Sequence, residues 1–388
     1  MKIYNHDIRT STHETSGGTH LYSGRALGLS EPTDIIQIHP ALKPEWDSIA
    51  AHYARIGLRH SHNVLWSLSL AHLQTYADYE PSVYFFGDAV CDHSPCAQFY
   101  RDIDQRWFDV VTYINAKNNF IELAQRLGLP VPATACFNRS AAVGQLERFT
   151  YPCYLKPSVS DSGFGILYCQ DARQLAAALM EWSDPVPFQI QAEAPSATFI
   201  NLQYQVTENG IERLLVSEQI LNGCVHGGNR YPTAHQPWSY FDPLAQWLAE
   251  QGMKGLFAFD AAVVDGAEHP YLAIECNPRF NGSSYPTLIA QKLGILQWSS
   301  ETLMTDYHSL ADLELRDLEF NPDLGTGIIL INWGTILVGK ISVLLAGTTV
   351  QQAALRTELQ NQLMDSEQLR PLNPRDYITK ELAKISGI

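Results

Sequence analysis

Apolar and polar residues alternate along the first part of the chain in blocks that predict strands and helices in turn. The apolar runs at 34–40, 82–88 and 108–115 each have the length of a strand. Between the first two runs, residues 44–58 place apolar side chains three or four positions apart, which indicates a helix. Strand–helix alternation favours a parallel sheet, so we expect an α/β domain at residues 1–112.

A helix is expected directly after this domain, because Phe120 and Leu127 belong to one apolar face and Gly128 would end it. Asn115 has the side chain of an N-cap residue, which places Lys117 in the first helical turn. A cation in that turn opposes the helix dipole, and an anion held nearby would offset the penalty. The alternative is a lysine that simply faces water.

A loop of small residues interrupts the next apolar segment. Residues 151–157 predict a strand with Lys156 near its end, residues 158–165 form the loop, and residues 166–169 resume as a strand. This order excludes a Walker A loop, in which the lysine follows the glycines and opens a helix. A glycine loop preceded by a lysine can cover phosphates, since its backbone N–H groups approach oxygen atoms closely. An ordinary hairpin loop is the alternative.

Later segments predict further strands. Residues 188–195 form a strand that ends at a proline, and residues 206–221 form a hairpin that turns at an Asn-Gly pair. Residues 255–279 predict a second hairpin, which can bring the carboxylates of Asp260 and Glu275 together across the ladder. Two like charges held close together need a cation to stabilise them.

The last part of the chain predicts a small α+β domain at residues 316–388. Strands are expected near 327–331, 335–338 and 341–345, followed by a helix at about 349–364. Glycines, an asparagine and a lysine interrupt the apolar residues of this region, so it does not have the pattern of a membrane span.

The segment 273–284 carries the most informative chemistry. Glu275, Asn277 and Arg279 occupy alternate positions, so their side chains leave one face of an extended strand. A carboxylate and an amide oxygen are hard ligands that suit Mg²⁺, and a guanidinium can hold an oxyanion with a planar fork of donors. Taken alone, the segment could equally be a polar strand end that meets water.

Composition narrows the class of protein. The formal net charge is -15 and the sequence pI is about 5.2, which disfavours a broad nucleic-acid-binding face. The seven cysteines are scattered without a paired framework, as is typical of a reducing cytoplasm. The first residues lack the apolar core of a secretory signal. We therefore expect a cytoplasmic protein without a nucleic acid or membrane partner.

The order of these features resembles the ATP-grasp superfamily over roughly residues 110–310. One lysine opens a helix, a second precedes a glycine loop, a strand leads into a hinge, and a carboxylate strand precedes the E-x-N-P-R segment. Biotin carboxylase and D-alanine–D-alanine ligase show the same succession. The resemblance implies an α/β and α+β protein with an ATP-grasp domain between the two small domains. That domain would span residues 113–315, with subdomains at 113–186 and 187–315.

The resemblance also implies roles for individual residues. The phosphates of ATP would be contacted by two lysines and the glycine loop, at Lys117, Lys156, Ser160, Ser162, Gly163 and Gly165. The adenine hinge would comprise Gln191, Ala192, Glu193 and Ala194. The ligands of Mg²⁺, or of Mn²⁺, would be Asp260, Glu275 and Asn277. The catalytic residues would be Arg279, which steadies the reacting anion, and Lys156.

The reaction implied is ATP-dependent formation of an amide or peptide bond between a carboxylic acid and an amine, through an acyl phosphate, with release of ADP and phosphate. The segment 219–233 resembles the part of peptide ligases that closes over the acceptor. His226 and Arg230 are therefore candidate substrate contacts, with exposed loop residues as the alternative, and Asn281 is a third candidate. The partners would be a small acid and a small amine, and a homodimer is common among such ligases. A phosphotransferase of the same fold and a non-catalytic nucleotide-binding protein remain open.

Overall fold

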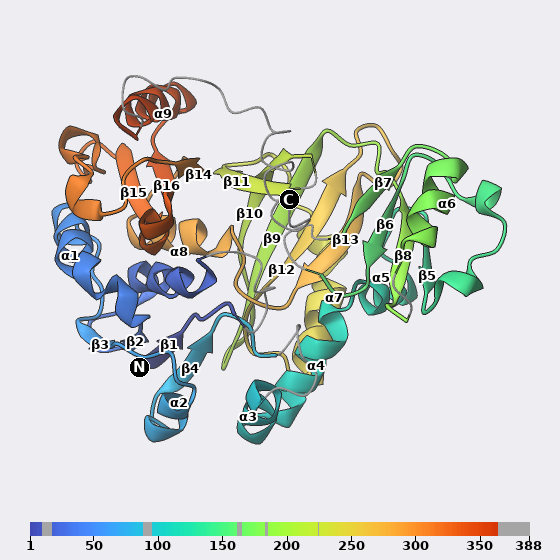
Figure 1. Cartoon of the computed structure of the whole chain (residues 1–388), viewed down its shortest axis with the longest axis horizontal. Helices are drawn as coiled ribbons and strands as arrows, with labels where there is room; N and C mark the ends of the chain where they lie inside the picture. The colour runs from blue at the N-terminus through green and yellow to red at the C-terminus, as the bar shows by residue number, and fades with distance from the viewer. Residues whose placement is uncertain (10–17, 88–94, 161–164, 183–184, 224, 364–388) are drawn as a thin grey trace, which may run out of the picture.

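Three β-sheets form the frame of the part of the chain that the structure describes (Figure 1). The computed structural model describes residues 1–9, 18–87, 95–160, 165–182, 185–223 and 225–363. A parallel sheet of four strands lies near the N-terminus, and a sheet of eight strands occupies the centre. A second four-stranded sheet lies at the other side of the molecule.

The N-terminal sheet is parallel, as predicted, with the strand order β3-β2-β1-β4. Its strands are β1 (Lys2–Asn5), β2 (Ile35–Gln37), β3 (Asn63–Leu65) and β4 (Glu80–Val83). The connecting helices are the 3-10 helices η1 (Thr19–Leu29) and η2 (Pro40–Glu45), with α1 (Trp46–Arg55) and α2 (Ala71–Thr75). The strand predicted at 34–40 and the helix predicted at 44–58 are therefore confirmed, with shorter bounds. The strand predicted at 82–88 lies earlier, at Glu80–Val83, and residue 88 is outside the described residues.

The strand predicted at 108–115 is wrong, because these residues belong to helix α4 (Gln105–Asn115), which follows helix α3 (Pro95–Ile103). Asp104 caps α4, since its side chain accepts a 3.0 Å hydrogen bond from the Trp107 N–H. The β-branched residues that suggested a strand are instead the buried face of this helix. Tertiary packing has overridden their strand propensity.

The helix predicted after this region is confirmed as α5 (Lys117–Arg126), but Asn115 is not its N-cap. Because α4 continues through Asn115, the cap position falls on Ala116, whose side chain cannot accept a hydrogen bond. The backbone N–H of Lys117 instead donates to the Ser158 carbonyl at 2.7 Å. The start of α5 is thereby fixed against the end of a strand in the small sheet.

The small sheet is antiparallel, with the strand order β5-β8-β6-β7. Its elements are β5 (Thr134–Phe137), β6 (Cys153–Pro157), β7 (Leu167–Cys169), β8 (Phe188–Ala192) and helix α6 (Ala172–Met180). Two 3-10 turns, η3 (Ser140–Ala142) and η4 (Leu146–Arg148), precede β6. The hairpin predicted around the glycine loop is confirmed, because Cys153 pairs with Cys169 and Leu155 with Leu167. A separate cluster of buried side chains supports this sheet.

The eight-stranded sheet has the order β13-β12-β9-β10-β11-β14-β16-β15. Its strands are β9 (Thr198–Thr207), β10 (Gly210–Asn222), β11 (Val225–Tyr231), β12 (Gly255–Val263), β13 (Tyr271–Asn277), β14 (Trp298–Met304), β15 (Gly327–Asn332) and β16 (Lys340–Ala346). The helices of this region are α7 (Trp238–Gln251), α8 (Ser284–Lys292) and α9 (Thr349–Leu363), with the 3-10 turns η5 (Leu310–Asp312) and η6 (Arg316–Leu318). Both predicted hairpins and the predicted C-terminal helix are present.

The strand predicted at 335–338 is wrong, because this segment lies within the 3-10 helix η7 (Trp333–Val338). Trp333 is fully buried, and its indole N–H donates to the Gly24 carbonyl at 2.9 Å. Gly24 leaves no space for a side chain, since a Cβ there would lie 2.7 Å from the Trp333 ring. This anchor to η1 turns the chain between β15 and β16.

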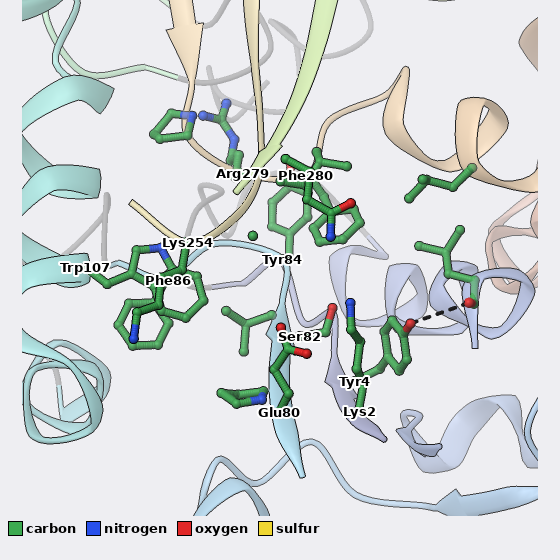
Figure 2. Close-up of a pocket in the computed structure, with 18 of the residues that line it drawn as sticks. Lys2, Tyr4, Glu80, Ser82, Tyr84, Phe86, Trp107, Lys254, Arg279 and Phe280 are labelled. Atoms are coloured by element: carbon green, nitrogen blue, oxygen red, sulfur yellow. Dashed lines mark hydrogen bonds between the residues drawn. The ribbon is translucent and has the colours of Figure 1, made fainter. Parts of the chain in front are cut away.

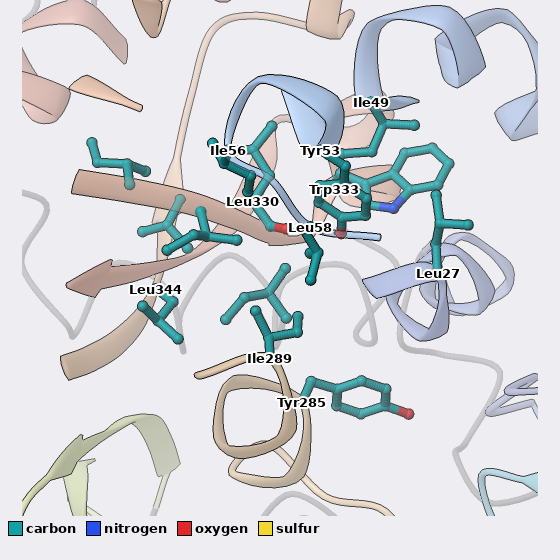
Figure 3. Close-up of a cluster of buried hydrophobic side chains, with 14 of the residues drawn as sticks. Leu27, Ile49, Tyr53, Ile56, Leu58, Tyr285, Ile289, Leu330, Trp333 and Leu344 are labelled. Atoms are coloured by element: carbon teal, nitrogen blue, oxygen red, sulfur yellow. Dashed lines mark hydrogen bonds between the residues drawn. The ribbon is translucent and has the colours of Figure 1, made fainter. Parts of the chain in front are cut away.

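The N-terminal and C-terminal parts of the chain share one hydrophobic core. Figure 3 shows Tyr53 from α1 close to Leu330 from β15 and Trp333, with Ile289 from α8 beside them. The Tyr53 hydroxyl donates to the Leu330 carbonyl at 3.0 Å. The predicted domain boundaries stay a prediction, but buried side chains from before the first boundary and after the last one pack in the same core.

Candidate active site

The two carboxylates predicted to meet across a hairpin are direct cross-strand partners. Asp260 on β12 pairs with Glu275 on β13, and Ala258 pairs with Asn277 two positions along the ladder. Because alternate residues of a strand leave the same face, Glu275 and Asn277 project to one side of the sheet. The hairpin register alone therefore places three oxygen-bearing side chains together.

Three side-chain amides surround the carboxylate of Asp260. Its Oδ1 accepts hydrogen bonds from Asn201 Nδ2 at 2.6 Å and Gln219 Nε2 at 2.8 Å, and its Oδ2 accepts one from Asn277 Nδ2 at 2.9 Å. Burial, and then the charge of Glu275, raise the pKa of Asp260 despite these donors. The amides orient the carboxylate without neutralising it.

Three cations act on the carboxylate of Glu275. Burial opposes its ionisation, but the ammonium of Lys117, 3.0 Å away, and the charges of Lys156 and Arg279 outweigh burial and lower the pKa of Glu275. Lys117 is buried rather than solvated, and its Nζ also donates to the Ser160 carbonyl at 3.3 Å. The two lysines and the arginine predicted from the sequence therefore converge on one carboxylate.

Lys156 reaches this site from β6 of the small sheet. Its Nζ donates to Gln191 Oε1 at 2.6 Å, and Gln191 Nε2 donates to Thr134 Oγ1 at 3.0 Å. The ammonium also lies 5.4 Å from the centre of the Tyr154 ring. A side chain from the neighbouring strand β8 thus sets the position of Lys156.

Arg279 lies just beyond β13, where the N-terminal sheet meets the large sheet. Its Nη1 donates to Asn115 Oδ1 at 3.0 Å, so the residue predicted to cap a helix orients the guanidinium instead. The backbone of Arg279 bridges to Phe85, and the Phe280 N–H donates to the Tyr84 carbonyl at 3.1 Å. Sequence reasoning did not foresee these contacts, which depend on segments far apart in the chain.

A cavity of about 450 Å³ lies next to Arg279, between β4, α4 and the start of β12. Figure 2 shows Arg279 and Phe280 at one end, Tyr84 beneath them, and Phe86 and Trp107 along the side. The Phe86 and Trp107 rings stack with centroids 3.8 Å apart. Two ion pairs, Lys254 with Asp104 and Lys292 with Glu31, also line the cavity.

The oxygen atoms of this site fit a magnesium ion. Among the residues that the structure describes, no group of three or more His, Cys, Asp or Glu side chains could hold a metal ion. A cation here would therefore depend on two carboxylates, Asp260 and Glu275, an amide oxygen of Asn277, and ligands from a bound substrate. Because the Asn277 nitrogen faces Asp260, its oxygen faces away from that carboxylate and can serve as a ligand.

Comparison with solved structures decides the fold. An N5-carboxyaminoimidazole ribonucleotide synthetase in complex with ADP matches 92% of this chain over 95% of its own, with a TM-score of 0.59 and 12% identity. The corresponding synthetase from Thermus thermophilus matches 96% of this chain over 100% of its own, with a TM-score of 0.54 and 15% identity. The chain has an ATP-grasp fold.

An L-amino acid ligase from Bacillus licheniformis is also similar, matching 93% of this chain over 96% of its own with a TM-score of 0.52 and 10% identity. No protein-family model matches the sequence, and no curated protein matches it. At these identities the similarity establishes the fold alone. The function must therefore be argued from the site.

The segment that contains the predicted glycine loop connects β6 to β7 in the sequence. Ser160 lies at its start, with a buried hydroxyl oxygen that lacks a hydrogen-bond partner. Gly165 lies at its end with φ +73°, a conformation that favours glycine. Ser162 and Gly163, also predicted to contact phosphate, lie outside the described residues. Their role stays a prediction.

The predicted adenine hinge follows β8. The N–H groups of Ala192 and Glu193 donate to the carbonyls of Ala133 and Pro152, each at 2.8 Å. The Ala194 carbonyl accepts from the Ser196 N–H at 2.7 Å, and the Glu193 carboxylate accepts from the Tyr154 hydroxyl at 3.0 Å. The backbone N–H groups of Ala192 and Glu193 therefore donate hydrogen bonds to other backbone segments of the protein.

The three candidate substrate residues have partners within the protein. His226 Nε2 lies 2.7 Å from Asn229 Oδ1, and Arg230, on the exposed side of β11, pairs with Glu218 at 2.5 Å. The Asn281 side-chain oxygen accepts from the backbone N–H groups of Ser283 and Ser284 and caps the turn before α8. Substrate contact by His226, Arg230 and Asn281 stays a prediction.

Several side chains of the site were not predicted from the sequence. Asn201 and Gln203 are buried on β9, where alternate amides interrupt an apolar strand. That pattern was a usable signal, because a buried amide needs hydrogen-bond partners. Gln219 offered less, since half-exposed polar residues are common at the end of a long hairpin strand.

Proposed function

We propose that this protein is an ATP-dependent ligase that joins a carboxylic acid to an amine and releases ADP and phosphate. The observation that supports this most strongly is the convergence of Lys117, Lys156 and Arg279 on Glu275, opposite Asp260. Solved structures with the same fold include an N5-carboxyaminoimidazole ribonucleotide synthetase with ADP and an L-amino acid ligase. Both names describe ligases that act on small molecules.

The two lysines would bind the phosphates of ATP. Lys117 now pairs with Glu275, and its ammonium can exchange this partner for a phosphate oxygen when the carboxylate binds a metal ion. Lys156 comes from the small sheet, and its charge acts on the same carboxylate. The backbone N–H groups of Ala192 and Glu193 already donate hydrogen bonds within the protein. We therefore propose that the backbone N–H of Ala194 donates to the adenine base.

Asp260, Glu275 and Asn277 would hold Mg²⁺ or Mn²⁺, which supplies charge neutralisation for phosphoryl transfer. The amides of Asn201 and Gln219 would keep the Asp260 carboxylate in position for this role. The glycine loop after Lys156 would exclude water, which hydrolyses an activated acid.

The substrate carboxylate would attack the γ-phosphate to give an acyl phosphate and ADP. The amine would then attack the acyl carbon, and phosphate would leave. Arg279, oriented by Asn115, would stabilise the oxyanion that develops during the second step. In its narrower form, the proposal is that the enzyme forms a peptide bond and that its substrates are amino acids or similar compounds.

A cytoplasmic location and a homodimer are parts of the same proposal. Cys153 and Cys169 face each other across the β6–β7 hairpin and are both free thiols, as expected in a reducing compartment. In the described residues, no helix has the length and apolar character needed to cross a membrane.

The test is ADP release by the purified protein with ATP, Mg²⁺ and a panel of amino acids and small acids, with the condensed product detected by mass. Hydroxylamine added in place of the amine should yield a hydroxamate, because it traps an acyl phosphate. A phosphorylated alcohol without hydroxamate would replace the ligase with a phosphotransferase. No ADP release with any pair would refute the proposal.

A further inference from the structure

A second arginine, Arg25 of η1, is buried beside Tyr84 without an acidic partner. It is 7% exposed, and among the described residues no aspartate or glutamate forms an ion pair with it. Its Nε and Nη2 atoms are buried and have no hydrogen-bond partner. The guanidinium also contacts the hydroxyls of Tyr84 and Tyr285, but its Nε and Nη2 donors stay unused. Buried donors without partners are costly, so a ligand is the natural explanation.

The unused nitrogens form one edge of the guanidinium, and this edge has a defined geometry. Its two N–H groups point in parallel and match the two oxygens of a carboxylate. The same chain shows the completed arrangement elsewhere, because Arg55 uses Nε and Nη2 to bind Glu319 at 2.6 and 2.7 Å. Arg25 presents that edge with nothing bound to it.

Aromatic rings cover the faces of the Arg25 guanidinium and leave its edge for a ligand. Its central carbon lies 4.2 Å from the Tyr285 ring centre, 4.7 Å from that of Tyr84 and 5.1 Å from that of Tyr22. Such contacts stabilise the charge without using the N–H groups. Tyr285 is fully buried, whereas Tyr22 and Tyr84 are half-buried. A ligand would therefore enter by displacing one of these two rings.

Tyr84 connects Arg25 to the catalytic centre. Burial raises the pKa of its phenol, but the guanidinium groups of Arg279 and Arg25 outweigh burial and lower it, since both reach the hydroxyl. The charge of Arg279 is balanced by nearby Glu275, whereas that of Arg25 has no such balance. An anion at Arg25 would thus lie one side chain away from Arg279.

The surroundings favour a carboxylate over a phosphate. His6, a titratable base that also contacts Tyr285, lies 2.7 Å from the Tyr285 hydroxyl and 3.3 Å from Ser82 Oγ. Burial, and then the charge of Arg25, lower the pKa of His6, so it adds no positive charge. One guanidinium edge with phenol hydroxyls suits a single negative charge, whereas a phosphate dianion draws on several cations.

We propose that Arg25, with Tyr84, binds the carboxylate of a substrate that reacts through another group at Arg279. The substrate class is an amino acid, whose own carboxylate is held while its amine or a side-chain acid reacts. That the ligand is a substrate rests on the proposed ligase function. Binding of the ligand at Arg25 can be measured without turnover.

The experiment compares the common L-amino acids with their C-terminal amides as ligands for the full chain, in the presence of ADP and Mg²⁺ at constant ionic strength. Thermal shift identifies binders, and calorimetry gives Kd. At least one free amino acid should bind, and its amide should bind at least about tenfold more weakly. Arg25→Gln and Arg25→Lys should each lose at least about tenfold, because lysine keeps the charge but not the fork. The thermal shift caused by ADP should be unchanged, which shows that the variants fold.

Arg101→Gln is the matched control, because Arg101 on α3 also lies over an aromatic ring, 4.5 Å from the centre of Phe108, and among the described contacts touches none of the rings around Arg25. It should bind amino acids as the wild type does. The inference would be overturned if the amides bound as tightly as the acids, or if Arg25→Gln bound amino acids as the wild type does. It would also be overturned if inorganic phosphate, but no amino acid, stabilised the protein through Arg25, or if no ligand bound at all.

The same measurements separate this inference from the ligase proposal. If amino acids bind through Arg25 but no ADP is released, the carboxylate site is supported and the proposed ligase function is refuted. ADP release from substrate pairs that lack a spare carboxylate, at equal rates in the wild type and Arg25→Gln, supports the ligase and removes the carboxylate site.

Discussion

At the scale of single residues, Asp260 and Glu275 differ because their neighbours differ. Neutral amides surround Asp260, whereas cations surround Glu275. A carboxylate held by neutral amides has no cation to release before a metal ion binds, whereas one held by lysine must first exchange its partner. Two carboxylates in one site are thereby prepared for different roles by the strands next to them.

Gln219→Ala should weaken activation by Mg²⁺ by about 10- to 100-fold, because a supporting partner of a metal ligand is lost. The measurement is ADP release against Mg²⁺ concentration at saturating ATP. Gln246→Ala is the control, since its side chain bonds only to Glu250 on the surface of α7 among the described contacts. An unchanged Mg²⁺ requirement in Gln219→Ala would contradict the assigned site.

Arg279→Ala should lower turnover by about a hundredfold or more, because one oxyanion donor typically contributes on the order of 3 kcal/mol to the barrier. ATP should still bind, since Lys117 and Lys156 are untouched, and calorimetry with ATP checks this. Asn115→Ala should cause a smaller loss of turnover, because it removes only the hydrogen bond that orients the guanidinium. Equal turnover in the wild type and Arg279→Ala would exclude the assigned role.

Residues of this site that lie at regular spacing within one segment could be predicted from the sequence. Residues that reach the site through contacts between distant segments could not. Glu275, Asn277 and Arg279 are found by strand alternation alone. Arg25 lies 254 positions and Tyr84 lies 195 positions before Arg279 in the sequence, and no local pattern connects them with it. Long-range contacts of this kind follow only from the arrangement of the sheets.

At the scale of elements, hairpins were predicted better than helices rich in β-branched residues. The β12–β13 hairpin is fixed by alternation and by its turn, so its register followed from the sequence. The sequence of helix α4 favours a strand through Val110, Val111 and Ile114, and the capping side chain of Asp104 is the local signal for a helix. The local cap and the burial of one helical face decided the outcome.

Helix α1 is joined to the segment before β15 by a buried network that should depend on pH. His52 Nδ1 and Arg55 both bind the Glu319 carboxylate, and His52 Nε2 accepts from the Leu330 N–H. Burial opposes ionisation of Glu319, but Arg55 and His52 outweigh it and lower its pKa to about 2. A lowered carboxyl pKa stabilises the fold above the ordinary value of 4.5, and this stability is lost as the pH falls towards 2.

Glu319→Gln should therefore lower the free energy of unfolding by about 2 kcal/mol at pH 7, a value that allows for the exposure of Arg55. The difference from the wild type should narrow as the pH falls below 4.5. Urea denaturation between pH 7 and 3 measures it. Glu314→Gln, in an exposed pair with Arg316, should change little at any pH. A gap that widens in acid would refute the network's role.

At the scale of the whole molecule, the first and last parts of the chain are one packing unit. Buried residues of η1 and α1 contact β15, η7 and α8 in the same core (Figure 3). Residues 1–112 expressed alone should therefore fail to fold, because the apolar surface that η7 and β15 cover would meet water. Circular dichroism and hydrogen exchange measure this. Slow exchange and a cooperative transition in the isolated segment would contradict it.

The small sheet differs from the rest because its buried cluster is its own. Lys156 belongs to it, whereas Lys117 starts a helix that packs on β13 beside Glu275. If the small sheet rotates as a body during each catalytic cycle, one lysine travels with it and the other stays with the carboxylates. A pair of labels on β6 and β13 would then report opening and closing as a change in separation, while labels on α5 and β13 would stay at a constant spacing.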